Sequence, residues 1–532
     1  MMSKNLIALL MILAALIGAL GELHGWLLPT LSWPFTVSRE IPFLSCSERV
    51  APSFAADGAF HWFGWLCMLV LICCGLYLLV RRGSSLRLPP EYAKRVQRFC
   101  KIKRGYWSLI IFGVIMLLAG LDQCLVGKRA LLVVHQGKWY SPALTRAVLP
   151  GETFGLTGAE AQAEPDYRAL KERSGQSGGP DFVLMPLVPY DPTMDASPFP
   201  AEPLVWKDGV LYDVDGDTPY NGLACRLYED GQLHLRQRYR KGLADGQVQG
   251  WLPNRTEVYT ATYKQGRKES ERYHGATSVE EFLALTPAGT EQCVYYHPAP
   301  PLTGGHLLGT NSQGADILAY LYGGLQVNIK ASLLYLPVIY TIGLTMGMLM
   351  GYFGGRFDLV TQRIIEIISQ LPFLFVVMIV SDFVPLQLRG LFLILSLLAM
   401  FGWMHMTYLV RTATMKEKTR DYVAAAKVMG AGTAHILWQH ILPNLRGIVV
   451  TLVPFSVAGV ILSLASLDYL GFGLPDTYAS WGRLLNDGLS KLSSPWIVSC
   501  AFFALVGTLL IVTFIGESVR EASDPRRHSY YE

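Results

Sequence analysis

The residues whose types and spacing best indicate function run from Asp421 to Asn444, DYVAAAKVMGAGTAHILWQHILPN. This run contains no pair of nucleophile and base and no cluster of metal ligands, which argues against catalysis. Its pattern predicts a short helix, a glycine turn at Gly430 and Gly432, and a second short helix that ends at Pro443. The small alanine side chains would let another protein approach the backbone closely. The chemistry expected here is therefore protein docking.

Other kinds of chemistry find less support in the sequence. An enzyme acting inside a membrane needs converging polar groups, and Ser396 and His405 share one apolar segment without a recognised motif around them. No GxxxxGK[ST] phosphate-binding loop occurs, so the chain is not expected to hydrolyse ATP itself. The nine cysteines show neither a CxxC pair nor a Cys/His metal spacing, so we expect no metal and no cofactor in this chain.

The composition is that of a membrane protein. Of the 532 residues, 51% are hydrophobic and 16% are charged, and the apolar segments are long enough to cross a hydrocarbon core about 30 Å thick. Backbone polar groups must be paired in lipid, so these segments are expected to be helices. The net charge of +4 is mild, which indicates basic loops beside a lipid membrane and no nucleic-acid surface. Eight spans are predicted, near residues 5–27, 59–80, 106–126, 332–353, 361–381, 388–410, 447–467 and 495–517.

The distribution of lysine and arginine predicts the orientation of these spans. The linker between the second and third spans is strongly basic and contains the single acid Glu91. The loop after the sixth span is basic as well, and alternation places both on the same side. Because basic loops collect on the cytoplasmic side, both termini are predicted inside and the region 128–305 outside. The basic residues are Arg81, Arg82, Arg87, Lys94, Arg95, Arg98, Lys101, Lys103 and Arg104 in the first group, and Arg411, Lys416, Lys418, Arg420, Lys427 and Arg446 in the second.

The first span has two interpretations. Lys4, the apolar run and the small residues near 18–21 are compatible with a cleaved signal peptide as well as with a retained anchor. We favour the anchor. Either way, the second span would run from outside to inside, so the orientation of the remaining chain is the same.

Local patterns predict how two core helices begin. Thr310 or Asn311 is expected to cap an amphipathic segment at 314–322, with Asp316 adding negative charge in its first turn. Glycines at 354–355 are expected to break the fourth span at its cytoplasmic end. At the start of the fifth span, Arg363 and Glu366 are spaced to form a local ion pair.

The region 128–305 is rich in glycine, proline, tyrosine and charge, and its short alternating runs predict β structure, for instance Leu131–Val134 and Arg236–Tyr239. A weak repeat lies within 221–275, where the motifs YRKG and YKQG each end in a glycine that permits a tight hairpin turn. The pattern is similar to the hairpin repeats of MORN proteins. An ordinary meander of tyrosine-rich strands explains it as well.

Two cysteines, Cys225 and Cys293, lie in this β-rich region. In an oxidising compartment they could form a disulfide that closes a long loop. Cys124, at the predicted membrane edge, is a possible competitor for either partner.

Several motifs in order resemble one family. They are RGYWSL at 104–109, GKWYSP at 137–142, HLLGT at 306–310, GAD at 314–316, YGG at 322–324, AAAKVMG at 424–430, LP at 442–443, LDYLGFGLP at 467–475, WG at 481–482 and GESVREASDP at 516–525. Together they resemble the permease subunits of oligopeptide and dipeptide ABC importers, in particular those of microcin C importers. The loop 421–444 resembles the "EAA" loop of these proteins, although Ala424 replaces its leading glutamate and Asn311 replaces an aspartate. The resemblance covers residues 94–145 and 300–527.

The resemblance implies an all-α polytopic membrane protein with a type I ABC importer core and a β-rich extracytoplasmic domain between its third and fourth helices. It implies a homologous permease, a cytoplasmic ATPase that holds ATP and Mg, and a periplasmic substrate-binding protein as partners, in a bacterial inner membrane. The loop would enter a groove of the ATPase and couple its closure to alternating access. Its contact or shape residues would be Ala424, Ala425, Ala426, Gly430, His440, Leu442 and Pro443.

The expected layout has five parts. They are an N-terminal pair of spans with a basic linker at 1–104, the first core helix at 105–127, the extracytoplasmic domain at 128–305, the transport core at 306–527 and a tail at 528–532. A membrane-anchored interaction protein that displays the β-repeat domain is the alternative, but such a protein would need no docking loop. Neither the cargo nor the role of the first two spans follows from the sequence.

Overall fold

The computed structural model describes residues 4–40, 61–80, 90–156, 161–162, 164–174, 180–193, 202–213, 216–220, 222–228, 233–252, 257–275, 278–286, 289–293, 298–384 and 390–523. The chain forms two compact units, Met1–Asp195 together with Ala315–Glu532, and Ala196–Gly314. The first unit contains the long helices and a small sheet, and the second is mainly β structure.

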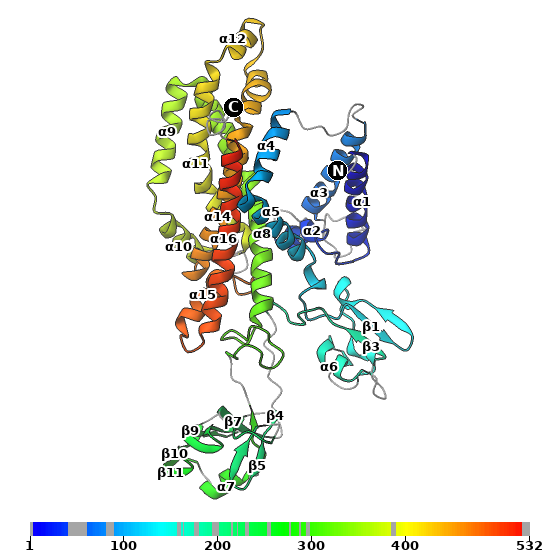
Figure 1. The fold of residues 1–532 in the computed structure, drawn as a ribbon, viewed down its shortest axis with the longest axis vertical. Coiled ribbons are helices and arrows are strands. Elements are labelled where there is room, and N and C mark those ends of the chain that lie inside the picture. Colours follow the sequence, from blue (N-terminus) through cyan, green and yellow to red (C-terminus); the bar gives the residue numbers. More distant parts are fainter. Residues whose placement is uncertain are drawn as a thin grey trace. The chain divides into compact units, whose positions relative to one another are not determined.

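The first unit is built around long helices that run side by side (Figure 1). Its N-terminal helices are α1 (Lys4–Leu23), α2 (Trp33–Glu40), α3 (Trp62–Val80), α4 (Pro90–Lys101) and α5 (Lys103–Gly120). The later ones are α8 (Ile317–Phe353), α9 (Gly355–Ser369), α10 (Phe373–Phe383), α11 (Leu391–Lys418), α12 (Asp421–Val428), α13 (Thr433–His435), α14 (Leu442–Tyr469), α15 (Trp481–Ser490) and α16 (Pro495–Ser523).

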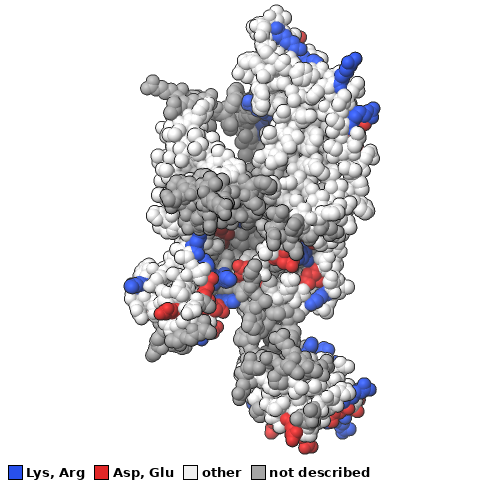
Figure 2. Space-filling view, turned by 180° about the vertical axis from the view of Figure 1, so that it is seen from behind, with Lys and Arg blue, Asp and Glu red and all other residues white. Residues whose placement is uncertain are grey.

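The number of apolar helices agrees with a polytopic membrane protein. Among the described residues, seven helices are long and apolar enough to cross a membrane, or eight if the bent pair α9 and α10 forms one span. On the face drawn in Figure 2, the middle of the helical body is almost free of charged residues, which gather near its ends. This band of uncharged surface is what a hydrocarbon environment requires.

The packing of α8 against α11 depends on three glycines. A side-chain carbon built on Gly347 would lie only 2.8 Å from the carbonyl oxygen of Thr407. Gly343 and Gly351, one turn to either side, have similarly close neighbours on α11. Such a row of small residues lets two helix backbones approach closely, and in lipid this packing is a main source of helix association. The row therefore fixes α11 on α8 along several turns.

The fifth predicted span is a bent pair and not one straight helix. The helices α9 and α10 meet at an angle of 66° around Pro372, which cannot continue α9 because it lacks an amide hydrogen. The break expected at Gly354 and Gly355 is present, since both residues have positive φ. The pair predicted between Arg363 and Glu366 is confirmed at 2.5 Å on an exposed face.

The start of α8 corrects two expectations. The helix begins at Ile317 and continues to Phe353, so the amphipathic segment and the fourth span are one helix. The capping residue is Asp316, whose carboxylate accepts the amide hydrogen of Ala319 at 2.7 Å, in place of the predicted Thr310 or Asn311. Aspartate is as good a helix cap as asparagine, and its charge also favours the positive end of the helix dipole.

A small sheet belongs to the first unit. The strands β1 (Leu132–His135), β2 (Lys138–Tyr140) and β3 (Phe182–Leu184) pair in the order β2-β1-β3, and α6 (Tyr167–Glu172) packs beside them. The predicted strand at Leu131–Val134 is thereby confirmed as β1, shifted by one residue. Val133, Phe154 and Tyr167 form the buried core of this part.

The second unit contains a sheet of seven strands in the order β11-β10-β9-β8-β7-β12-β4. The strands from β7 to β11 form an antiparallel meander, and α7 (Val279–Ala284) inserts the fully buried ring of Phe282 against Tyr259 and Val248. The strands are β4 (Glu202–Pro203), β7 (Gly222–Leu227), β8 (Leu233–Arg240), β9 (Leu243–Trp251), β10 (Glu257–Lys264), β11 (Arg267–Tyr273) and β12 (Gln292–Cys293), with a separate hairpin of β5 (Val205–Lys207) and β6 (Val210–Tyr212).

The two tight turns predicted from the repeat motifs are present. Lys241 and Gly242 both have positive φ between β8 and β9, and Gln265 and Gly266 have the same geometry between β10 and β11. Positive φ at both central residues matches the right-handed twist of a hairpin. The other turns of the proposed repeat, at 229–232 and 253–256, lie outside the described residues, so the relation to MORN repeats stays a prediction.

A buried histidine makes the stability of the second unit depend on pH. His234 is fully buried, its Nδ1 shares a hydrogen bond with the Thr286 hydroxyl, and its ring packs 4.7 Å from that of Phe282. Burial lowers the pKa of His234 to about 4. Because an unfolded histidine titrates near 6.5, the unfolded chain binds the extra proton between these values, and stability falls as the pH drops from about 6.5 to 4.

We predict that His234→Leu flattens this pH dependence. At pH 5 the wild-type unit should have lost about 2 kcal/mol relative to neutral pH through this residue, and the variant should lack that loss. Hydrogen exchange of β8 and α7 peptides in the full-length protein measures it. Leucine in place of the exposed His274 is the control and should keep the wild-type profile. A wild-type profile in His234→Leu would contradict the assignment.

Candidate functional site

The run 421–444 forms a rigid hairpin and not a flexible loop. Helix α12 ends in a Schellman motif, in which the amide of Ala431 donates to the carbonyl of Ala426 and the amide of Gly430 donates to that of Lys427, both at 3.0 Å. Gly430 has φ of +83°, a left-handed conformation that an L side chain adopts only with strain. The backbone at Gly432 has φ of −66°, a conformation that any residue can adopt. The turn therefore depends on Gly430.

Pro443 does not end the second helix, contrary to the prediction. The chain from α13 continues through a π-helical segment, Ile436–Ile441, directly into α14, with Pro443 in the first turn of α14. Proline removes an amide hydrogen and clashes with the carbonyl four residues earlier, and a π-helical turn widens the backbone where that clash would occur. The hairpin is thus continuous with a membrane-spanning helix.

The inner side of the hairpin is anchored in an apolar core. Val423 and Ala426 of α12 are buried, as are Ile436 and Ile441 of the second helical segment. They form one cluster with residues of α8 and α11, namely Met348, Met406 and Val410, and Leu442 packs at its edge. Of the predicted loop residues, Ala426 therefore serves the shape of the hairpin and is not available to a partner.

The outer side of the hairpin carries exposed small and apolar residues. Ala424 and Ala425 are exposed on α12, and Val428 and Met429 at its end are 89% and 79% exposed. Trp438 on the second segment is 60% exposed. Large apolar side chains this exposed beside small ones are typical of a protein contact surface. We call these five residues the docking face.

A polar network fastens α12 to its neighbours. The Tyr422 hydroxyl donates to the Glu417 carboxylate at 2.7 Å and accepts from the Asn444 amide at 3.0 Å. Burial and this bond to Glu417 raise the pKa of Tyr422 to about 12, so the hydroxyl keeps its proton. His440 is half-buried with its ring 6.4 Å from that of Tyr422 and 5.5 Å from that of His435. The network ties the end of α11 to the start of α14.

Two further contacts hold the same end of the bundle. The Arg411 guanidinium makes a two-pronged ion pair with the buried Asp358 carboxylate, with both distances at 2.5 Å, which joins α11 to α9. Lys418 and Lys427 lie over the ring of Tyr352 at 5.6 and 5.1 Å. The sequence patterns did not predict either contact, and Arg411 was counted only among the basic residues of the loop.

The LDYLGFGLP motif forms a second structured region at the other end of α14. The buried Asp468 carboxylate accepts the amide hydrogen of Leu474 at 2.6 Å and the hydroxyl hydrogen of Ser480. Trp481, next in the chain, donates to the Leu321 carbonyl of α8 at 2.9 Å. The carboxylate thus closes the segment after α14 into a fixed loop that is fastened to α8.

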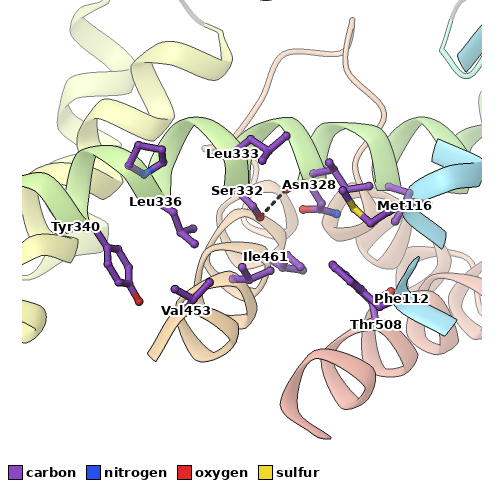
Figure 3. A pocket seen from close by; sticks show the side chains of 14 residues that line it. Phe112, Met116, Asn328, Ser332, Leu333, Leu336, Tyr340, Val453, Ile461 and Thr508 are labelled. Atoms are coloured by element: carbon purple, nitrogen blue, oxygen red, sulfur yellow. Dashed lines mark hydrogen bonds between the residues drawn. The ribbon is translucent and has the colours of Figure 1, made fainter. Parts of the chain in front are cut away.

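A cavity of about 380 Å³ lies among α5, α8, α14 and α16 (Figure 3). Its lining is almost entirely apolar, but Asn328 and Ser332 of α8 belong to it, and Ser332 donates to the backbone carbonyl of Asn328. Asn328 is 8% exposed, and its side chain lies on the lining of this cavity. An amide in apolar surroundings favours a polar group in the cavity. In the sequence, the cavity is indicated only by the amide side chain of Asn328 within an apolar run.

The remaining predicted residues have a clear place or stay untested. Cys225 lies in β7, and the backbone of Cys293 pairs with the neighbouring Ala224. The side chain of Cys293 is outside the described residues, so the disulfide remains a prediction. Within the described ranges, no group of three or more His, Cys, Asp or Glu side chains could hold a metal ion.

Comparison with known proteins agrees with this geometry. The family model described as binding-protein-dependent transport system inner membrane component matches residues 343–529. The chain is 26% identical over 440 residues to the peptidoglycan transport system permease protein YejE of Agrobacterium fabrum, covering 82% of this chain and 94% of that one. It is 29% identical over 441 residues to the inner membrane ABC transporter permease protein YejE of Escherichia coli, covering 83% and 99%.

A third relative has a higher sequence identity over a shorter stretch of the chain. Over 229 residues the chain is 34% identical to the oligopeptide transport system permease protein OppC of Haemophilus influenzae, covering 43% of this chain and 73% of that one. The chain therefore belongs to the family of binding-protein-dependent transport system inner membrane components, the permeases of ABC transporters.

Proposed function

We propose that this chain is the permease subunit of an ATP-driven importer of oligopeptides or peptide-like compounds in a bacterial inner membrane. The observation that carries the proposal is the docking face on a rigid hairpin at one end of the bundle. Similarity to permeases named for oligopeptide and peptidoglycan transport supports the class of cargo. ATP and Mg would be held by a separate cytoplasmic ATPase, and this chain would not be an enzyme.

The ATPase would receive the docking face in a groove. Ala424 and Ala425 would allow close backbone contact, whereas Val428, Met429 and Trp438 would supply the apolar area that contact requires. Lys427, exposed on the same helix, would add a charge at the rim. The buried residues Val423 and Ala426 would keep the hairpin in shape while the ATPase pulls on it.

Coupling would follow from the continuity of the hairpin with α14. A displacement of α12 passes through the Schellman turn and the π-helical segment into α14, and through Tyr422 and Glu417 into α11. Closure of the ATPases would thereby shift the core between two discrete arrangements, inward-facing and outward-facing. No chemical relay is needed for this.

The other partners follow from the same proposal. A homologous permease would complete the transport path, and a periplasmic binding protein would deliver cargo to the outer mouth. Both termini would lie in the cytoplasm and the β-rich region 128–305 in the periplasm, where it would dock the binding protein or serve as a scaffold. Asn328 would offer cargo a hydrogen bond inside a mostly apolar cavity.

We predict that Ala425→Glu abolishes co-purification of the ATPase. The position is exposed, so the chain should fold normally, but the added carboxylate would be buried without a partner in the complex. The measurement is the amount of ATPase retained on the tagged, co-expressed permease. Gln97→Glu, at an exposed position of α4, introduces the same side chain away from the docking face and should retain the ATPase.

The Ala425→Glu experiment also separates the two candidate functions. If the wild-type chain retains no ATPase, the proposal that it is an importer subunit is wrong. A membrane-anchored interaction protein that displays the β-rich domain then becomes the better account. If both glutamate variants retain it equally, the docking face is wrong.

We further predict that Gly430→Ala uncouples transport from ATP hydrolysis, because alanine at φ of +83° costs about 1–2 kcal/mol and loosens the turn. Peptide uptake per ATP hydrolysed, measured in vesicles with the assembled transporter, should fall. Gly432→Ala is the matched control, since its backbone suits any residue and open space surrounds both glycines. Equal effects of the two substitutions would show that backbone conformation is not what the turn needs.

A further inference from the structure

A second cavity, of about 390 Å³, lies at the end of the bundle that carries the hairpin. It is bounded by α4, α5, α14 and α16. Its walls are apolar and include Val96, Phe99, Leu109, Val450, Ile515 and Val519. None of the five residues of the docking face lines this cavity, so its shape and charge require an explanation of their own.

Two arginines from different helices lie at this cavity. Arg95 belongs to α4 and Arg446 to the first turns of α14, and both line it. The Nη1 atom of Arg95 is 3.5 Å from a side-chain carbon built on Gly447, which places the guanidinium beside the residue that follows Arg446. Arginine binds a phosphate with paired hydrogen bonds, so two arginines on the lining of one apolar cavity favour a phosphate at this place.

The basic residues of α4 favour an anion as well, whereas two carboxylates lie on the neighbouring α16. Helix α4, PEYAKRVQRFCK, carries Lys94, Arg98 and Lys101 besides Arg95 and contains one acid. On α16, the carboxylates of Glu517 and Glu521 lie 3.5 and 3.0 Å from the guanidinium of Arg104. Helix α4 has its basic residues on one side of an amphipathic helix and packs against α5 and α16. A basic amphipathic helix beside a membrane span is typical of a surface that meets anionic lipid.

We propose that this cavity is a binding site for one anionic phospholipid. Its phosphate would lie between Arg95 and Arg446, and an acyl chain would fill the apolar space between α4, α5, α14 and α16. A zwitterionic lipid would satisfy the apolar walls but would lack the net negative charge that a basic surface attracts.

The site has a consequence for coupling, because Arg446 stands three residues after Pro443, where the hairpin passes into α14. A lipid held there joins α4 and α16 to the base of the hairpin. The lipid would stabilise the part of α14 through which displacement of the hairpin must pass. Transport would then depend on anionic lipid independently of which cargo is carried.

The test is native mass spectrometry of the full-length chain in non-ionic detergent, with dioleoylphosphatidylglycerol or dioleoylphosphatidylcholine added at equal concentration. We expect one phosphatidylglycerol retained per chain and little phosphatidylcholine. Arg95→Gln with Arg446→Gln should weaken phosphatidylglycerol retention about tenfold or more, which corresponds to the loss of charge-assisted hydrogen bonds. Arg356→Gln with Lys416→Gln removes the same charge at exposed positions and should leave retention unchanged.

A second variant tests the acyl-chain part. Val519→Trp places a larger side chain on the cavity wall, leaves both arginines in the sequence and should also displace the lipid. Equal retention of the two lipids by the wild type would overturn the proposal even if no variant folds. Equal loss in both glutamine pairs would show only a general charge effect, and undiminished binding by Val519→Trp would show that the cavity holds no acyl chain. Either result would contradict the site.

Discussion

The close packing of α8 on α11 is the contact on which the rest of the first unit depends. Gly343, Gly347 and Gly351 lack the side chains that would keep the two helices apart. In lipid the hydrophobic effect does not drive helices together, so this close packing is a main source of their association. The same contact positions Met406 and Val410, which pack against the buried side of the hairpin, and it brings Arg411 to Asp358. A larger residue at Gly347 would therefore disturb the hairpin as well as the bundle.

The hairpin combines a buried inner side with an exposed apolar outer side. Its inner side is packed like a protein core, with Val423 and Ile441 fully buried, and its outer side exposes Val428 and Met429. The packed inner side allows a displacement of the hairpin to be transmitted to the bundle, and the apolar outer side allows a partner to bind. The π-helical segment before Pro443 joins both to α14 without a break. A structure of this kind suits a mechanical link between two subunits better than a catalytic site.

The sequence predicted the apolar spans, the β-rich region, the Gly430 turn and the hairpin turns at Gly242 and Gly266, because each rests on a local property of the chain. It was wrong where tertiary packing or a local adjustment decided the outcome. Proline at 443 reads as a helix end, but the preceding π-helical turn accommodates it. The Arg411–Asp358 pair, the position of the buried Asn328 on a cavity and the burial of Ala426 depend on neighbours far away in sequence. The glycine row of α8 was visible as a four-residue spacing and could have been used.

The most direct test of the account is photo-crosslinking from the docking face. A photo-reactive benzoylphenylalanine in place of Met429, which is 79% exposed, should crosslink to the co-expressed ATPase. The same group in place of Leu117, 65% exposed on the membrane-spanning α5, should give no ATPase product. A crosslink from the first position alone is the predicted result. No ATPase product from Met429, or equal products from both positions, would contradict the hairpin as the site of ATPase docking.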